Sequence, residues 1–140
     1  MPQGIEDVSI LDEDLLWRRI LDDPTRWWTK NPDGTIRPSS SSFLQRKEKD
    51  SDKLENGLSV QLSKLTTQKK ASSFIESAGL AEIEVNVPRE LNLDVIYDPI
   101  EEDIAHTLIS PKENQKITKA QARKLAGAVK MIVLPKSQRQ

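Results

Sequence analysis

The strongest constraint on the fold is the stretch from residue 81 to residue 109, in which apolar and polar side chains alternate. The first alternating apolar positions are Ile83, Val85 and Val87. A period of two is typical of a strand with one buried face, because successive side chains point to opposite sides of a sheet. Pro88 ends this run, and two more runs follow at residues 91–97 and 105–109. The short links between the three runs favour antiparallel neighbours.

Residues 58–62 alternate in the same way, and several segments have the spacing of helices. The longest is residues 118–133, where Thr118 is a candidate N-cap and an apolar stripe can lie on the sheet. A second helix is predicted over residues 68–78, with Phe74 and Ile75 inward and Gly79 closing it. The pattern therefore predicts an α+β fold: a small three- to four-stranded, mainly antiparallel sheet packed by helices, including a C-terminal helix.

Residues 12–21 are predicted to form a short amphipathic helix. Three acidic residues lead it, which suits the positive end of the helix dipole, and Pro24 follows its end. Arg18 and Arg19 would then point into solvent or along a groove, and exposure is the ordinary state of a charged side chain.

The chain has 140 residues, of which 36% are hydrophobic and 4% aromatic, so one modest core is expected. We expect a flexible arm at residues 1–10, a single α+β domain at residues 11–135, and a frayed tail at residues 136–140. Within the domain, residues 46–56 form a mixed-charge run with a single apolar residue, which predicts a solvated loop.

Several classes of protein are excluded by residue types. The absence of cysteine excludes disulfides and thiolate metal sites, and one histidine excludes a His-rich metal site. The acidic residues at 98–103 lack the alternating ligands of a calcium loop, so we expect neither a metal nor a cofactor. No apolar run approaches the roughly 20 residues needed to span a membrane. The polar, acidic N-terminus is unlike a secretory signal, and a soluble, cytoplasmic protein is expected.

The charge is unevenly distributed along the chain. Residues 1–25 carry seven acidic and two basic side chains, a net charge of −5, whereas residues 112–140 carry eight basic and one acidic, a net charge of +7. A basic helix leaves nucleic-acid binding open. The overall charge of −1 and the pI near 5.9 argue against it, because bulk attraction to phosphate needs excess positive charge.

Trp27 and Trp28 are adjacent and precede a strong turn signal at residues 31–34. Paired tryptophans can cover a core edge, stack on a ligand or anchor a protein partner, and covering the core is favoured because so small a core needs its large residues. As partner-binding candidates we take Trp27, Trp28 and Arg18.

Arg37, Ser39 and Ser40 form a candidate anion site. Pro38 favours an extended Arg37, and a following serine can cap a short helix that carries Phe43 inward. Helix amides, hydroxyls and a guanidinium together suit an anion. Simple capping by these serines is the alternative interpretation.

His106 is the only side chain that ordinarily titrates near neutral pH. With Arg37 and Ser39 nearby it would complete a ligand-binding or catalytic set for a phosphate compound, but no complete catalytic set is evident and the catalytic residues are unknown. Alternatively, His106 pins the loop at residues 98–104.

Four short motifs occur in a fixed order along the chain: LWRRI near the N-terminus, GTIRPSSSSF at residues 34–43, LSV at 58–60, and YDP followed by AHTLI at 97–109. This pattern resembles a group of small bacterial proteins of unassigned function that combine R-P-S-S-x-x-F with D-P-x-x-x-x-x-H-A. The resemblance implies a bacterial, stand-alone, single-domain protein in which Arg37, Ser39, Ser40 and His106 belong to one pattern. No activity comes with it.

Two functions follow from these features. The favoured one is a small binding or accessory protein that acts through a protein partner, since the charges are asymmetric and the catalytic set is incomplete. The alternative is a small enzyme or toxin-like effector that acts on nucleotide or RNA phosphates through an Arg/Ser/His site.

Overall fold

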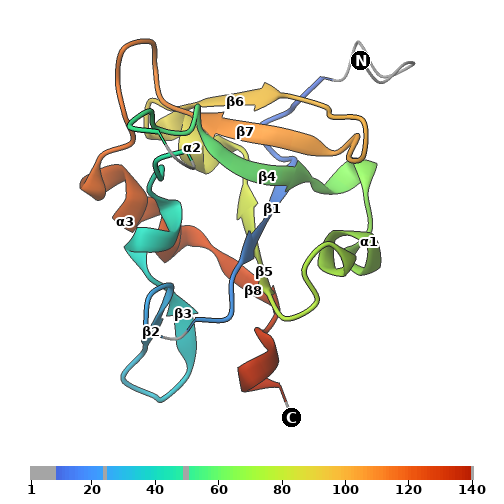
Figure 1. The fold of residues 1–140 in the computed structure, drawn as a ribbon, viewed down its shortest axis with the longest axis vertical. Helices are drawn as coiled ribbons and strands as arrows, with labels where there is room; N and C mark the ends of the chain where they lie inside the picture. Colours follow the sequence, from blue (N-terminus) through green and yellow to red (C-terminus); the bar gives the residue numbers. More distant parts are fainter. Residues whose placement is uncertain (1–8, 24, 49–50, 140) are drawn as a thin grey trace.

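The centre of the molecule is a six-stranded sheet in which every neighbouring pair is antiparallel (Figure 1). The computed structural model describes residues 9–23, 25–48 and 51–139. The strands follow the order β6–β7–β4–β1–β5–β8 across the sheet. Their bounds are β1 Leu15–Ile20, β4 Leu58–Leu62, β5 Gly79–Glu84, β6 Asp94–Tyr97, β7 His106–Ser110 and β8 Lys130–Val133.

A separate two-stranded hairpin lies at the lower left of Figure 1, built from β2 (Trp28–Lys30) and β3 (Ile36–Pro38). The predicted turn joins the two strands: Gly34 has a φ of +88° and donates its amide to the Asn31 carbonyl at 3.0 Å. Glycine adopts this left-handed conformation without a Cβ penalty, which explains its place in the turn.

Short helices connect and cover the strands. The α-helices are α1 (Gln68–Ser73), α2 (Asn86–Glu90) and α3 (Lys119–Ala128). Three 3-10 helices accompany them, η1 (Ser40–Phe43), η2 (Ser63–Leu65) and η3 (Lys136–Gln138). None of the helices in the described ranges has the length and apolar character needed to cross a membrane.

The main core lies on the face of the sheet that α3 and η1 cover. Phe43 of η1, Leu125 of α3 and the strand residues Leu16, Leu58 and Ile83 are buried in one apolar cluster there. A smaller cluster on the other face joins Trp17 and Leu80 to Ala71 of α1. Because both faces are partly covered, the central strands carry apolar residues at consecutive positions as well as at alternate ones.

The predicted helix at residues 12–21 is wrong, because these residues include the central strand β1. Leu16 and Ile20 face the main core, whereas the intervening Trp17 lies in the cluster on the other face. A six-residue segment that buries side chains on both faces has no clear period of two, so periodicity alone does not separate it from a helix.

The fold class is confirmed, but the sheet has six strands and not three to four. The two strands beyond the four predicted runs are β1 and β8. The helix predicted over residues 118–133 ends at Ala128, Val129 is extended, and residues 130–133 pair with β5. The β-branched Ile132 and Val133 suit this strand, and pairing with β5 outweighs the helical spacing.

Other boundaries also moved. The strand predicted to reach Val87 is β5, which ends at Glu84, and Val87 belongs to the helix α2. Helix α1 begins after Thr67, whose hydroxyl oxygen accepts a hydrogen bond from the amide of Lys70 at 3.1 Å. It ends at Ser73, however, so Phe74 and Ile75 are 40% and 38% exposed, against the prediction that they are buried.

The two ends of the domain are tied to it. The amide of Ser137 in η3 donates to Asp22 at 2.8 Å, within the segment expected to fray. The Lys64 ammonium donates to the Ser9 carbonyl at 2.6 Å. Most of the arm predicted at residues 1–10 lies outside the described residues.

Thr118→Ala is expected to lower the free energy of unfolding by about 1 kcal/mol. Thr118 accepts the amide of Gln121, and the Gln121 side chain accepts the amide of Thr118, so the predicted cap is a reciprocal capping box. Urea denaturation measures the change. Lys119→Ala, one residue into the helix, is the control and should change stability by less than about 0.5 kcal/mol; equal losses would show that the box contributes nothing.

Candidate functional site

The predicted anion site at residues 37–40 lies in a serine-rich turn between β3 and η1. Arg37 is exposed in β3, and Ser39 stands at the N-cap position of η1 without a side-chain capping bond. The Ser39 hydroxyl instead lies 2.6 Å from the hydroxyl of Ser41, which donates to the carbonyl of Arg26 at 2.6 Å. Ser40 is the first residue of η1. These hydroxyls therefore tie the start of η1 to the segment just before β2.

His106 lies at the start of β7, beside the loop that joins β6 to β7. Its Nδ1 is 2.8 Å from the carbonyl oxygen of Asp98 and 3.2 Å from Oδ2 of the same residue. The hairpin that carries Arg37 lies at the lower left of Figure 1, and the loop beside His106 lies at the upper right. The structure thus does not bring His106 and Arg37 together, and His106 holds the loop at Asp98.

Trp27 and Trp28 are both buried. The indole of Trp28 donates to the carbonyl of Leu21 at 2.8 Å and forms part of the core edge. Two guanidinium groups lie over the Trp27 ring: the Cζ of Arg26 is 4.6 Å and the Cζ of Arg46 is 5.1 Å from the ring centroid. Trp27 therefore supports two cations besides covering the core.

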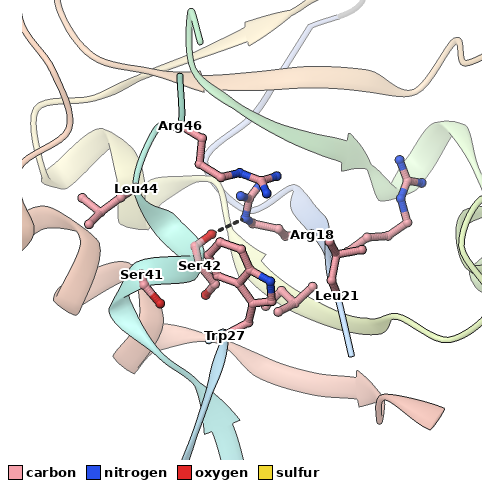
Figure 2. Close-up of a pocket in the computed structure, with 9 residues that line it drawn as sticks. Arg18, Leu21, Trp27, Ser41, Ser42, Leu44 and Arg46 are labelled. Atoms are coloured by element: carbon pink, nitrogen blue, oxygen red, sulfur yellow. Dashed lines mark hydrogen bonds between the residues drawn. The ribbon is translucent and has the colours of Figure 1, made fainter. Parts of the chain in front are cut away.

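These observations lead to a cleft that we call the arginine cleft, formed by Arg18, Arg19 and Arg46. It has a volume of about 200 Å³, and Leu21, Ser59, Ile75 and one acidic residue, Glu55, also line it. A smaller hollow lined by the same three arginines, Trp27 and Ser42 adjoins it. Figure 2 shows this hollow, in which Arg18 and Arg46 approach each other above Trp27.

The arginine cleft exists because β1 and β4 stop pairing within the sheet. Their ladder consists of Leu16 with Leu62 and Trp17 with Gln61. Beyond it the Arg18 side chain bridges the two strands: its Nη1 donates to the carbonyl of Ser59 at 2.8 Å, and its Nε donates to the carbonyl of Ser42 at 2.9 Å. One guanidinium thus joins β1, β4 and η1.

The partners of Arg18 are neutral. Its Cζ also lies 5.5 Å from the centroid of the Phe43 ring. Burial, followed by the like charge of Arg46, lowers the pKa of Arg18 to about 10, while Glu55 acts in the opposite direction. The group is still a cation at neutral pH, but its positive charge is poorly stabilised.

The guanidinium of Arg19 is also held by neutral groups. Arg19 donates Nη1 to the carbonyl of Ala71 at 3.2 Å, and its Cζ lies 4.7 Å from the Phe74 ring centroid. Burial lowers the pKa of Arg19, with Asp103 opposing. Over residues 9–23, 25–48 and 51–139, neither Arg18, Arg19 nor Arg46 forms an ion pair.

Sequence reasoning singled out Arg18 and Trp27 but missed Arg19 and Arg46 as site residues. Arg46 opens the charged run expected to be a solvated loop, and it lies 28 positions after Arg18. The described residues of this run are mostly exposed, as expected, and its two ends are joined by a bridge between Lys47 and Leu54 and by the Glu55 amide, which donates to the Arg46 carbonyl at 2.8 Å. The only sequence signal was Arg18-Arg19 itself, two cations inside an apolar segment.

The comparisons provide no family: no family model, curated protein or solved structure matches the chain.

Proposed function

We propose that this is a small binding protein that acts through a partner protein, and that the arginine cleft binds an acidic segment of that partner. The observation that carries the proposal is the set of three guanidinium groups, Arg18, Arg19 and Arg46, which line one cleft and form no ion pair among the described residues. One carboxylate, that of Glu55, also lines the cleft and accepts a hydrogen bond from the Arg46 amide at 3.0 Å, so the three cations remain in excess.

The electrostatics of the cleft favour an anion. Arg18 and Arg46 have like charges and lie close enough that Arg46 lowers the pKa of Arg18. A carboxylate between them would replace this repulsion with attraction, and guanidinium groups bind carboxylates through two parallel hydrogen bonds. Binding of a carboxylate would therefore stabilise the protonated, cationic form of Arg18.

The rim of the arginine cleft is apolar, which favours a protein segment over a free ion. Leu21 and Ile75 line the cleft and are 40% and 38% exposed. Phe74, which stacks on Arg19, is similarly exposed. Exposed apolar groups beside cations suit a peptide that carries both acidic and apolar side chains. Because the whole chain has a net charge of −1, the attraction is local to the cleft.

The test is the binding of two synthetic peptides that differ only in charge, one of alternating Glu and Leu and one of alternating Gln and Leu. Intrinsic tryptophan fluorescence can report binding, since Trp17 lines the cleft and Trp27 lies under Arg46. We expect the acidic peptide to bind more tightly than the neutral one, and its affinity to fall as the salt concentration rises, because salt screens exposed charges.

Arg46→Ala is expected to weaken the binding of the acidic peptide about tenfold, corresponding to roughly 1.4 kcal/mol. Arg37→Ala is the matched control, since Arg37 is an exposed arginine of the hairpin and does not line the cleft. The proposal is wrong if the two peptides bind alike, or if both variants weaken binding equally. If a short single-stranded RNA displaced the bound acidic peptide at lower concentrations than the peptide itself needs to bind, a phosphate-binding function would be favoured instead.

A further inference from the structure

Ser59, which lines the arginine cleft, begins a connected series of three side chains: Ser59, His106 and Asp98. The hydroxyl of Ser59 lies 3.1 Å from Nε2 of His106. Nδ1 of the same ring lies 2.8 Å from the carbonyl oxygen and 3.2 Å from the carboxylate of Asp98. A hydroxyl, an imidazole and a carboxylate in this order have the geometry of an activated nucleophile.

The contacts of the ring define its tautomer. A backbone carbonyl can only accept a hydrogen bond, so Nδ1 of His106 carries the proton that points to Asp98. In the neutral ring Nε2 is then the acceptor, and the hydroxyl of Ser59 donates to it. A general base needs this tautomer, because the free electron pair of the ring faces the hydroxyl to be deprotonated.

The sheet positions these groups rigidly. In the β4–β7 ladder Ser59 pairs with Leu108, and Gln61 pairs with His106. Ser59 and His106 are therefore diagonal neighbours on one face of two paired strands. The loop beyond them is closed by the amide of Asp98, which donates to the His106 carbonyl at 3.0 Å. Ser59 is exposed and lines the arginine cleft, so a ligand in the cleft can reach its hydroxyl.

A cation lies on the same face. Trp17 in β1 pairs with Gln61 in β4. Arg19 lies two residues after Trp17 and Ser59 two residues before Gln61, so both point to the same side of the sheet as this pair, and both line the cleft. The guanidinium of Arg19 can stabilise negative charge on a substrate that reacts at Ser59.

We propose that Ser59 is a catalytic nucleophile, with His106 as its general base, for the hydrolysis of a carboxylic ester that carries a negatively charged group. The Ser59 oxygen attacks the ester carbonyl while its proton passes to Nε2 of His106. The tetrahedral intermediate collapses to an acyl-Ser59 ester, and His106 returns the proton to the departing alcohol. Water, deprotonated by His106, then attacks the acyl group and releases the carboxylic acid and the free serine.

Asp98 is a positioning residue in this reaction. Its carboxylate stabilises the imidazolium that forms when His106 takes the proton. Its backbone carbonyl, which no side-chain substitution removes, holds the ring orientation. Asp98→Asn should therefore slow the reaction while preserving the fold, and Asp98→Glu should recover part of the rate. A purely structural Asp98 would affect thermal stability and leave the reaction unchanged.

The experiment uses the full chain and diisopropyl fluorophosphate, a neutral reagent that phosphorylates activated serines with loss of fluoride. We expect one adduct by intact mass, located on Ser59 by peptide mapping. Ser59→Ala should abolish it, and His106→Gln should slow it by roughly 10²-fold or more, the contribution usual for a general base. Ser40→Ala, a variant of the serine-rich turn, is the matched control and should react like the wild type.

A second measurement uses two activated esters, p-nitrophenyl hydrogen succinate, which is anionic, and p-nitrophenyl acetate, which is neutral. The wild type should hydrolyse the anionic ester faster, and Arg19→Ala should abolish the preference. Folding of every variant is checked by its melting temperature.

An unlabelled Ser59 in the folded wild type would overturn the proposal, as would equal labelling in folded His106→Gln. Because the fluorophosphate is uncharged, this outcome is independent of whether acidic peptides bind the cleft.

Discussion

Phe43→Ala is expected to lower the free energy of unfolding by about 3–5 kcal/mol, the range for removing a fully buried aromatic ring. Phe43 has no exposed surface and lies in the main core cluster, beneath the helix α3. Alanine would leave a cavity there, because the four-residue η1 follows β3 closely, packs against α3 and can relax only partly into the gap. The change is measured by urea denaturation.

Phe74→Ala is the matched control for this prediction. Phe74 is the other phenylalanine of the chain and is 40% exposed at the rim of the arginine cleft. Its removal should cost less than about 1 kcal/mol, since little apolar surface returns to water. Similar losses for both variants would contradict the position of Phe43 in the core. Phe43→Ala should in addition weaken peptide binding, because the ring supports the guanidinium of Arg18.

Gly57→Ala is expected to destabilise the protein by about 1–3 kcal/mol, the usual cost of forcing extra volume into a packed site. Gly57 immediately precedes β4, and a Cβ there would lie 2.6 Å from the carbonyl oxygen of Ile109 in β7. The obstructing atom belongs to the backbone of a paired strand, so no side-chain rotation relieves the contact. The β4–β7 ladder would have to shift, and its loss of register should also disturb Ser59 and His106.

Gly127→Ala is the control for Gly57→Ala. Gly127 lies in α3, and nothing comes within 4 Å of a Cβ added there. Alanine should therefore stabilise the protein by up to about 1 kcal/mol, the difference in helix propensity between the two residues. Urea denaturation of both variants is the test, because the two changes in the free energy of unfolding should have opposite signs. If both variants lost stability, or both gained it, the packing around Gly57 would be contradicted.

Local patterns predicted much of this fold. The alternation of residues 58–62 and 105–109 became β4 and β7, and Thr118 caps α3 as its position indicated. In each case the signal and its physical cause lie within a few residues of each other: one buried strand face, or one hydroxyl that satisfies a helix amide. Such elements are readable without knowledge of their neighbours.

The candidate site was less readable because its parts come from distant segments. Arg18 was selected as a partner-binding residue, but for a helix that does not exist, and Arg46 was assigned to a solvated loop. Ser59 lies in the LSV motif but carried no catalytic signal, since an exposed serine in a strand is ordinary. Its significance depends on His106, which is 47 residues away and adjacent only through the β4–β7 pairing.

The sequence by itself thus determined the α+β class, the strands with one clear buried face and the capped helix, because these depend on local periodicity and local hydrogen bonds. Only the tertiary structure decided that residues 15–20 form the central strand and that three arginines share one cleft. Both features depend on contacts between segments that are distant in the sequence. Strand β1 is stabilised by pairing with β4 and β5, and the cleft opens where the β1–β4 pairing stops.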